Sequence, residues 1–165
     1  RIAELEKIRN FLTGQALTTI LDAAFMEQIK STNSLKIKIL LPHEGEAARL
    51  LNLPSSLIKK DRLNSAIKLS IKFNAMTVLK GPQTLITDGK KTFRCLDGSS
   101  VLSTAGTGDI LAGLISSFLA QGLSPMDSCK LGVAIHGHCA DESNLKSGLM
   151  PSELIHLIRN YINQL

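Results

Sequence analysis

The sequence predicts an α/β fold built around a mostly parallel sheet. Short apolar segments with strand character alternate with longer segments in which apolar residues recur at helical spacing. This alternation is typical of strand–helix–strand units. The chain has 165 residues, of which 44% are hydrophobic, which is enough to bury a core. No repeat or low-complexity segment interrupts it, so we expect residues 1–165 to belong to a single domain.

The first half of the chain is predicted to contain strands and helices in alternation. Strands are expected where short apolar segments end at a polar residue or turn, at residues 16–21, 37–41 and 75–79. Helices are expected where apolar residues follow a spacing of three or four, at residues 2–12, 23–31, 46–51 and 61–73. In the last of these helices, Leu63, Ile67 and Ile71 are expected to face the core.

The second half is predicted to contain a β-hairpin and then helices. The hairpin would pair residues 85–87 with residues 92–96 around a turn at residues 88–91. The helices are expected at residues 109–120, 125–141 and 151–163. The first of them carries no charge after Asp109, so we expect most of its surface to be buried.

The helix expected at 125–141 has a clear start and small residues inside it. Ser124 followed by Pro125 is typical of a cap and a first helical position. Gly132, Ala134 and Gly137 leave room for a neighbouring element, so close helix packing is expected there.

A glycine-rich loop precedes the helix expected at 109–120. Gly106 and Gly108 flank Thr107, and Asp109 follows directly. Backbone amides at a helix start have no internal partner and lie at the positive end of the helix dipole, so such a loop is suited to bind a phosphate. The alternative is a simple cap, with Thr107 as the N-cap and Asp109 favourable to the dipole. The spacing matches neither a Walker A loop nor a dinucleotide-binding fingerprint.

Two predicted strands end in polar residues. Pro42 and His43 follow the strand at 37–41, and Lys80 follows the strand at 75–79. Ligands of open α/β sheets bind beyond the carboxyl ends of the strands, so these residues are candidates for a binding site. The alternatives are a turn histidine that bonds the backbone and an ordinary lysine before a turn.

Composition argues against several other classes of protein. The net charge is +5, but the lysines are scattered and the chain has no Trp and a single Tyr, so no nucleic-acid surface is expected. No apolar run is long enough for a membrane span. Cys95, Cys129 and Cys139 have no paired spacing, which fits a reducing compartment, and we expect the protein in the cytoplasm. His136 and His138 beside Cys139 lack a second ligand pair, so no metal site is expected there.

Several motifs together resemble one enzyme family. The sequence is similar to the C-terminal part of the NAD(P)H-hydrate dehydratase family in the ribokinase-like superfamily, through residues 41–51 (LPHEGEAARLL), 78–81 (VLKG), 105–109 (AGTGD), 119–125 (LAQGLSP) and 131–137 (LGVAIHG). The resemblance implies a three-layer αβα sandwich from which N-terminal strands are missing. It also contains a departure, because the family usually has an acid where this chain has Ala24.

The resemblance implies an activity and roles for particular residues. The family dehydrates hydrated NADH or NADPH at the expense of ADP or ATP, with Mg²⁺ on the phosphates. Asp109 would be the catalytic base and would contact the hydrated dinucleotide together with His43. The adenine nucleotide would contact Lys80, Gly81, Pro82, Gln83, Thr84, Gly106, Thr107 and Gly108. A homo-oligomer and a fused or separate epimerase domain are further expectations.

Two other functions remain open from the sequence. The same fold serves small-molecule kinases that phosphorylate vitamin precursors. A non-catalytic remnant, or a half-domain that needs a partner chain, is the other alternative, supported by Ala24 and by the late start of the sequence within the family domain.

Overall fold

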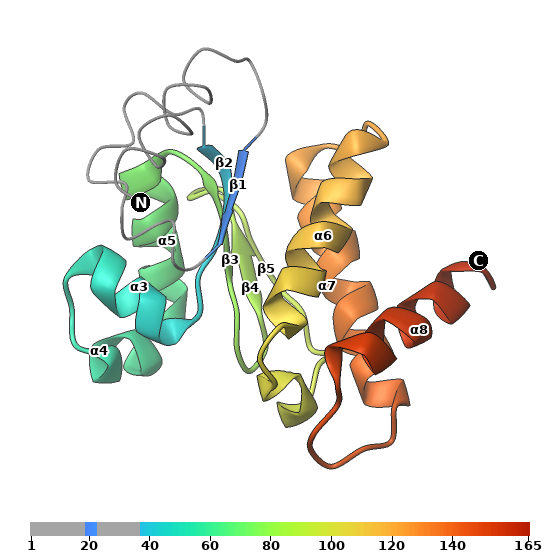
Figure 1. The fold of residues 1–165 in the computed structure, drawn as a ribbon. Helices are drawn as coiled ribbons and strands as arrows, with labels where there is room; N and C mark the ends of the chain where they lie inside the picture. Colours follow the sequence, from blue (N-terminus) through green and yellow to red (C-terminus); the bar gives the residue numbers. More distant parts are fainter. Residues whose placement is uncertain (1–18, 23–36) are drawn as a thin grey trace, which may run out of the picture.

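The computed structural model describes residues 19–22 and 37–165 (Figure 1). The helices predicted at 2–12 and 23–31 lie outside these residues, as do Ala24 and the first part of the strand predicted at 16–21. The described residues contain no helix with the length and hydropathy that crossing a membrane requires.

Within residues 19–22 and 37–165, the sheet has five strands in the order of the sequence. They are β1 (Thr19–Asp22), β2 (Ile37–Leu41), β3 (Met76–Leu79), β4 (Leu85–Thr87) and β5 (Thr92–Arg94). β1, β2 and β3 pair in parallel, whereas β3 with β4 and β4 with β5 pair antiparallel. The predicted hairpin is therefore confirmed, although β5 ends two residues before the predicted Leu96, which is 75% exposed.

The parallel strands bring their carboxyl ends to one edge of the sheet. Ile39, Leu41 and Val78 are fully buried because helices cover both faces, as is usual for parallel strands. Asp22, His43 and Lys80 lie at or just beyond the ends of β1, β2 and β3. Residues that are far apart in the sequence thus meet at this edge.

Helices α3 (Glu44–Leu51), α4 (Ser55–Lys60) and α5 (Arg62–Phe73) cover one face of the sheet (Figure 1). α3 starts two residues earlier than predicted, because His43 caps it and Glu44 is already helical. α4 was not predicted, since it is a single short stretch of which only Ile58 is buried.

The predicted core face of α5 is wrong for Leu63 and Ile71, and Ile67 is only half-buried. Leu63 is 42% exposed and Ile71 is 68% exposed, whereas the buried residues are Ser65, Ala66, Leu69 and Ser70. Small side chains let the helix lie close to the sheet, and the Ser70 hydroxyl donates to the Ala75 carbonyl over 2.7 Å. A serine bonded in this way is buried without an unpaired polar atom.

The opposite face is covered by α6 (Thr107–Ala120) and α7 (Pro125–Glu142), with α8 (Pro151–Ile162) packed beyond them (Figure 1). The structure therefore has the predicted three layers, with the sheet between two helical layers. α7 starts as predicted, with Ser124 as N-cap and Pro125 in the first turn.

α6 is less buried than its lack of charge predicted. Leu111 and Ile115 are buried against the sheet and α7, but Gly113, Ser116 and Ser117 are exposed. Uncharged small residues are compatible with water as well as with a core, so the absence of charge did not identify a buried surface.

Glycines of α7 allow close approaches, as predicted. A Cβ on Gly132 would lie 2.6 Å from Ile115 Cγ1, so this glycine sets the distance between α6 and α7. A Cβ on Gly137 would lie 2.8 Å from the carbonyl of Asp97, so this glycine admits a loop rather than a helix.

Candidate active site

Two adjoining cavities open at the carboxyl edge of the parallel strands. The larger has a volume of about 740 Å³ and the smaller about 260 Å³. Both are lined by Lys80, Gly81, Thr107 and Gly108, which therefore form the boundary between them. A group bound at this boundary is accessible from both cavities.

The larger cavity brings together the residues predicted to bind the dinucleotide. His43 and Asp109 both line it, although they are 66 positions apart in the sequence. Asp22 and Glu44 add carboxylates, and Lys59 adds a cation. The wall thus offers acids, a histidine and cations for a polar ligand.

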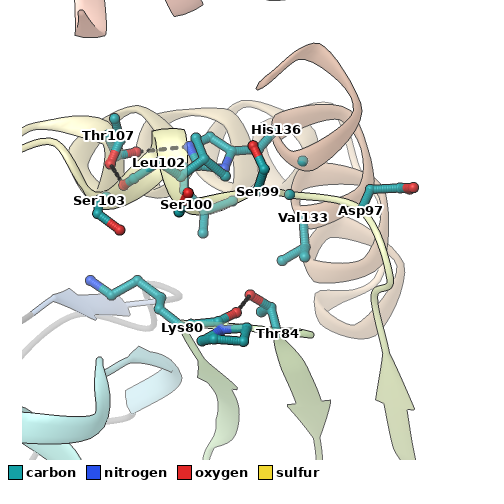
Figure 2. Close-up of a pocket in the computed structure, with 16 residues that line it drawn as sticks. Lys80, Thr84, Asp97, Ser99, Ser100, Leu102, Ser103, Thr107, Val133 and His136 are labelled. Atoms are coloured by element: carbon teal, nitrogen blue, oxygen red, sulfur yellow. Dashed lines mark hydrogen bonds between the residues drawn. The ribbon is translucent and has the colours of Figure 1, made fainter. Parts of the chain in front are cut away.

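The smaller cavity contains most of the predicted nucleotide residues (Figure 2). Lys80 and Thr84 lie on the sheet side, and Ser99, Ser103 and Thr107 lie across the cavity from them. Gln83 does not line this cavity, because its side-chain oxygen accepts a hydrogen bond from Arg94 over 3.1 Å on the outer surface. The segment from Asp97 to Ser103 was not predicted as part of a site.

The glycine loop forms the N-terminus of α6 without a side-chain cap. Gly106 is the N-cap and has φ +93, a left-handed conformation that favours glycine. The alternative with Thr107 as N-cap is wrong, because Thr107 is the first helical residue. Its hydroxyl oxygen lies 2.7 Å from the Leu102 carbonyl and 2.8 Å from the Thr104 carbonyl. The Thr107 amide donates to the Thr104 carbonyl over 3.3 Å, whereas the Gly108 and Asp109 amides have no hydrogen-bond partner within the described residues and are available to an anion.

His136 of α7 supports the same turn from behind. Its Nε2 lies 2.9 Å from the carbonyl oxygen of Thr107, and donation to that carbonyl places the proton on Nε2 (Figure 2). Burial lowers the pKa of His136, the bond to Thr107 opposes that shift, and the charge of Lys80 adds to it. The neutral imidazole therefore holds the loop without adding positive charge to the cavity.

Lys80 and Asp22 form an ion pair at the boundary of the cavities. The Lys80 ammonium lies 2.7 Å from Asp22 Oδ1. A Cβ on Gly108 would lie 3.1 Å from the Lys80 ammonium, so glycine lets this charge approach the start of α6. An ammonium there faces the positive end of a helix dipole, and Asp22 offsets the repulsion. The arrangement is suited to a phosphate that contacts both Lys80 and the α6 amides.

His43 has a structural role as well as a place in the larger cavity. Its Nδ1 accepts hydrogen bonds from the amides of Gly45 and Glu46 over 2.9 and 3.3 Å. Glu46 returns the interaction by accepting from the His43 amide over 2.6 Å, which completes a capping box. The turn interpretation is thus confirmed, and the ring is held in a fixed orientation at the cavity wall.

The histidines and cysteines considered as metal ligands point to different surroundings. His136 bonds Thr107, and Cys139 lies in a core cluster of α7 and α8. His138 packs against Tyr161, with ring centroids 4.8 Å apart and the rings tilted by 56°. Over residues 19–22 and 37–165, no three His, Cys, Asp or Glu side chains gather closely enough to hold a metal ion. Burial raises the pKa of the Cys129 thiol to about 12, which leaves it protonated.

Comparisons with known proteins agree with one family. The family described as NAD(P)H-hydrate dehydratase matches the chain over residues 2–163. The bifunctional NAD(P)H-hydrate repair enzyme of Vibrio cholerae is 33% identical over 167 residues, which cover 99% of this chain and 34% of that protein. The ADP-dependent (S)-NAD(P)H-hydrate dehydratase of Neisseria meningitidis is 36% identical over 121 residues, which cover 70% of this chain and 41% of that protein.

Solved structures show the same relationship. The ADP/ATP-dependent NAD(P)H-hydrate dehydratase from Bacillus subtilis, co-crystallised with ATP/Mg²⁺, matches with a TM-score of 0.86 at 25% identity. The match covers 96% of this chain and 59% of that structure. A ribokinase-like superfamily protein from Enterococcus faecalis, 24% identical with a TM-score of 0.81, supports the fold alone. The chain spans only 34% of the Vibrio relative's length, but its motifs, site and fold agree, and it belongs to the NAD(P)H-hydrate dehydratase family.

Proposed function

We propose that this chain takes part in the dehydration of hydrated NADH or NADPH, driven by ADP or ATP. The observation that carries the proposal is the position of Asp109. Its carboxylate stands in the first turn of α6 and lines the larger cavity, one residue after Gly108, which lines both cavities. A proton acceptor therefore lies beside a site suited to a phosphate. The Neisseria relative, named an ADP-dependent dehydratase, supports the choice of substrates.

The two cavities suit two ligands. The adenine nucleotide would occupy the smaller cavity, with its phosphates toward Lys80, Gly108 and the first amides of α6. The hydrated dinucleotide would occupy the larger cavity, in contact with His43 and Asp109. Because Lys80 and Gly108 line both cavities, the phosphoryl group would pass between the ligands at that boundary.

The chemistry requires one base and stabilisation of negative charge. The 6-hydroxyl oxygen of the hydrated dinucleotide would attack the terminal phosphorus of ADP, and AMP would leave. Asp109 would take the hydroxyl proton during this attack. The amides at the start of α6 and the Lys80 ammonium would stabilise the charge on the phosphoryl group. Departure of phosphate with the C–O electron pair, and loss of a proton from the neighbouring ring carbon, would restore the reduced nicotinamide.

The site fits a magnesium ion that arrives with the nucleotide. Mg²⁺ is usually held by one or two carboxylates together with substrate phosphates rather than by a protein cage. The Asp22 and Asp109 carboxylates line the larger cavity, and the described residues hold no ready cluster of three ligands. Asp22 would be the protein ligand, which leaves Asp109 free to act as the base, and the ion would neutralise phosphate charge.

A recovery assay tests this proposal. The purified chain is given hydrated NADH, Mg²⁺ and either ADP or ATP, and the return of the reduced-nicotinamide absorbance is measured. Asp109→Asn should lower the turnover rate by about 10²–10⁴-fold, the usual contribution of a general base. Asp127→Asn is the matched control, because Asp127 also lies in the first turn of a helix but lines neither cavity.

Either of two results would count against the proposal. Full activity of the Asp109→Asn protein would remove the proposed base. No recovery from a folded, unaltered chain would favour the half-domain alternative, in which another segment or chain completes the site. Vitamin-precursor alcohols serve as alternative acceptors in the same assay. A homo-oligomer, an associated epimerase domain and a cytoplasmic location stay predictions.

A further inference from the structure

Arg62 lines neither of the two cavities but contacts residues that do. It is the first residue of α5, directly after the N-cap Asp61, and its side chain reaches the end of β3. The side chain is only 16% exposed. Sequence reasoning assigned it no role, because nothing in its local sequence distinguishes it from a surface arginine at a helix start.

The guanidinium of Arg62 binds three backbone carbonyls of one loop. Nη2 donates to the Leu79 carbonyl over 3.1 Å and to the Lys80 carbonyl over 3.3 Å, and Nη1 donates to the Pro82 carbonyl. Leu79 is the last residue of β3, and Lys80 and Pro82 follow the end of that strand. A planar guanidinium with several donors can bind carbonyls in three directions, which a lysine ammonium cannot do in the same geometry.

The loop that Arg62 holds is the sheet-side wall of the smaller cavity. Lys80, Pro82 and Thr84 line that cavity, and the Thr84 hydroxyl donates to the Gly81 carbonyl over 3.1 Å. Gly81 has φ +130, and a Cβ there would lie 3.1 Å from Arg62 Nη2. The loop thus turns sharply against the guanidinium, and glycine permits both the conformation and the approach.

A second contact joins Arg62 to the larger cavity. Arg62 Nε lies 3.2 Å from Glu44 Oε1. Glu44 directly follows His43 in the chain and lines the larger cavity. Nε makes no aligned hydrogen bond to any residue within the described ranges, so charge rather than hydrogen bonding holds this pair. Burial lowers the pKa of the guanidinium, the Glu44 carboxylate opposes that shift, and nearby Arg94 adds to it.

We infer that Arg62 is a positioning residue for the nucleotide, because it fixes the backbone that presents Lys80 and Thr84 to the smaller cavity. Glu44 links the same guanidinium to the helix that His43 caps. The inference rests on the proposed function for the identity of the ligand, whereas the restraint on residues 79–82 stands on the contacts alone. The hydrogen bonds from Arg62 to the loop carbonyls, rather than its ion pair with Glu44, set the affinity for the nucleotide.

Paired variants separate these contacts. Arg62→Lys keeps the positive charge beside Glu44 but removes the three-way hydrogen bonding. Glu44→Gln removes the charge pair and leaves the carbonyl bonds in place. Lys68→Met on the exposed side of α5 is the matched control. ADP affinity is measured by titration calorimetry, amide exchange of residues 79–84 by mass spectrometry, and folding by thermal unfolding.

The inference predicts different behaviour for the two contacts. Arg62→Lys should weaken ADP binding about tenfold or more and speed amide exchange at residues 79–84, as expected for lost hydrogen bonds from a charged donor. Lys68→Met should leave ADP affinity within about threefold of the unaltered chain, which is below 1 kcal/mol, and Glu44→Gln should weaken ADP binding less than Arg62→Lys does.

Three results would decide against the inference or its basis. Unchanged exchange of residues 79–84 in Arg62→Lys would overturn the positioning role. Equal weakening of ADP binding by Glu44→Gln and Arg62→Lys would assign the effect to the ion pair and overturn the role of the carbonyl bonds. Failure of the unaltered chain to bind ADP would contradict the proposed function. The amide-exchange measurement would still test whether Arg62 restrains residues 79–82.

Discussion

At the scale of single residues, Lys80 is the most informative side chain of the site. It follows β3, lines both cavities and pairs with Asp22 at 2.7 Å. The sequence predicted it as a nucleotide contact through the resemblance to the family, and the structure adds its distance to Asp22 and its approach to Gly108.

Replacing Lys80 should weaken nucleotide binding more than it weakens the fold. Lys80→Met removes a charged hydrogen-bond donor from the boundary of the cavities, and a bond of this kind contributes about 1.5–3 kcal/mol. We therefore expect ADP affinity to fall by about 10- to 100-fold, measured by titration calorimetry. Lys90→Met, in the exposed turn of the hairpin, is the control. Equal ADP affinity in Lys80→Met and the unaltered chain would place the phosphates elsewhere.

At the scale of elements, the contact between α6 and α7 depends on Gly132. A Cβ there would lie 2.6 Å from Cγ1 of Ile115, which is fully buried and β-branched. Gly113 in the middle of α6 is the opposite case, because no described atom beyond its chain neighbours and its own helix backbone lies within 4 Å of the position of its Cβ. The same substitution is thus expected to have opposite effects at these two helical glycines.

The pair Gly132→Ala and Gly113→Ala tests this packing. Gly132→Ala should lower the free energy of unfolding by about 1–3 kcal/mol, the usual cost of overpacking a core. Gly113→Ala should raise it by about 0.5–1 kcal/mol, since alanine loses less backbone entropy in a helix. Both values follow from urea denaturation monitored by circular dichroism. Stabilisation by both substitutions would show that α6 and α7 separate easily.

At the scale of the whole molecule, His136 couples the site to stability. It lies in α7 and bonds Thr107 of α6, so it joins the start of one helix to the middle of another. Burial lowers the pKa of His136 in the folded protein, whereas the unfolded chain has the ordinary value of about 6.5. Below that pH the unfolded state binds more protons than the folded state, so acid favours unfolding.

The free energy of unfolding should therefore fall as the pH is lowered through about 6.5, until the folded-state pKa of His136 is reached. Urea denaturation at pH 7.5 and pH 5.5 measures the difference. His136→Gln keeps an amide donor for the Thr107 carbonyl but cannot take up a proton, so its stability should change less over that interval. Parallel pH profiles for the two proteins would contradict the role of His136.

The sequence predicted the sheet well and the helix faces less well. β2, β3 and the hairpin matched because short apolar runs bounded by turns report local structure directly. The core face of α5 was wrong because hydrophobicity alone favoured Ile71 over Ser65 and Ser70. Burial of a serine depends on a partner such as the Ala75 carbonyl, which only the folded chain supplies.

The sequence alone determined the alternation of strands and helices, the glycine-rich loop that leads into α6, and the motifs that place the chain in its family. These features are local, because a turn, a cap or a motif is formed by residues adjacent in the chain. The tertiary structure alone decided that Arg62 binds the loop after β3 and that His136 bonds Thr107. Such contacts join residues 17 to 29 positions apart, and their formation depends on how whole elements pack.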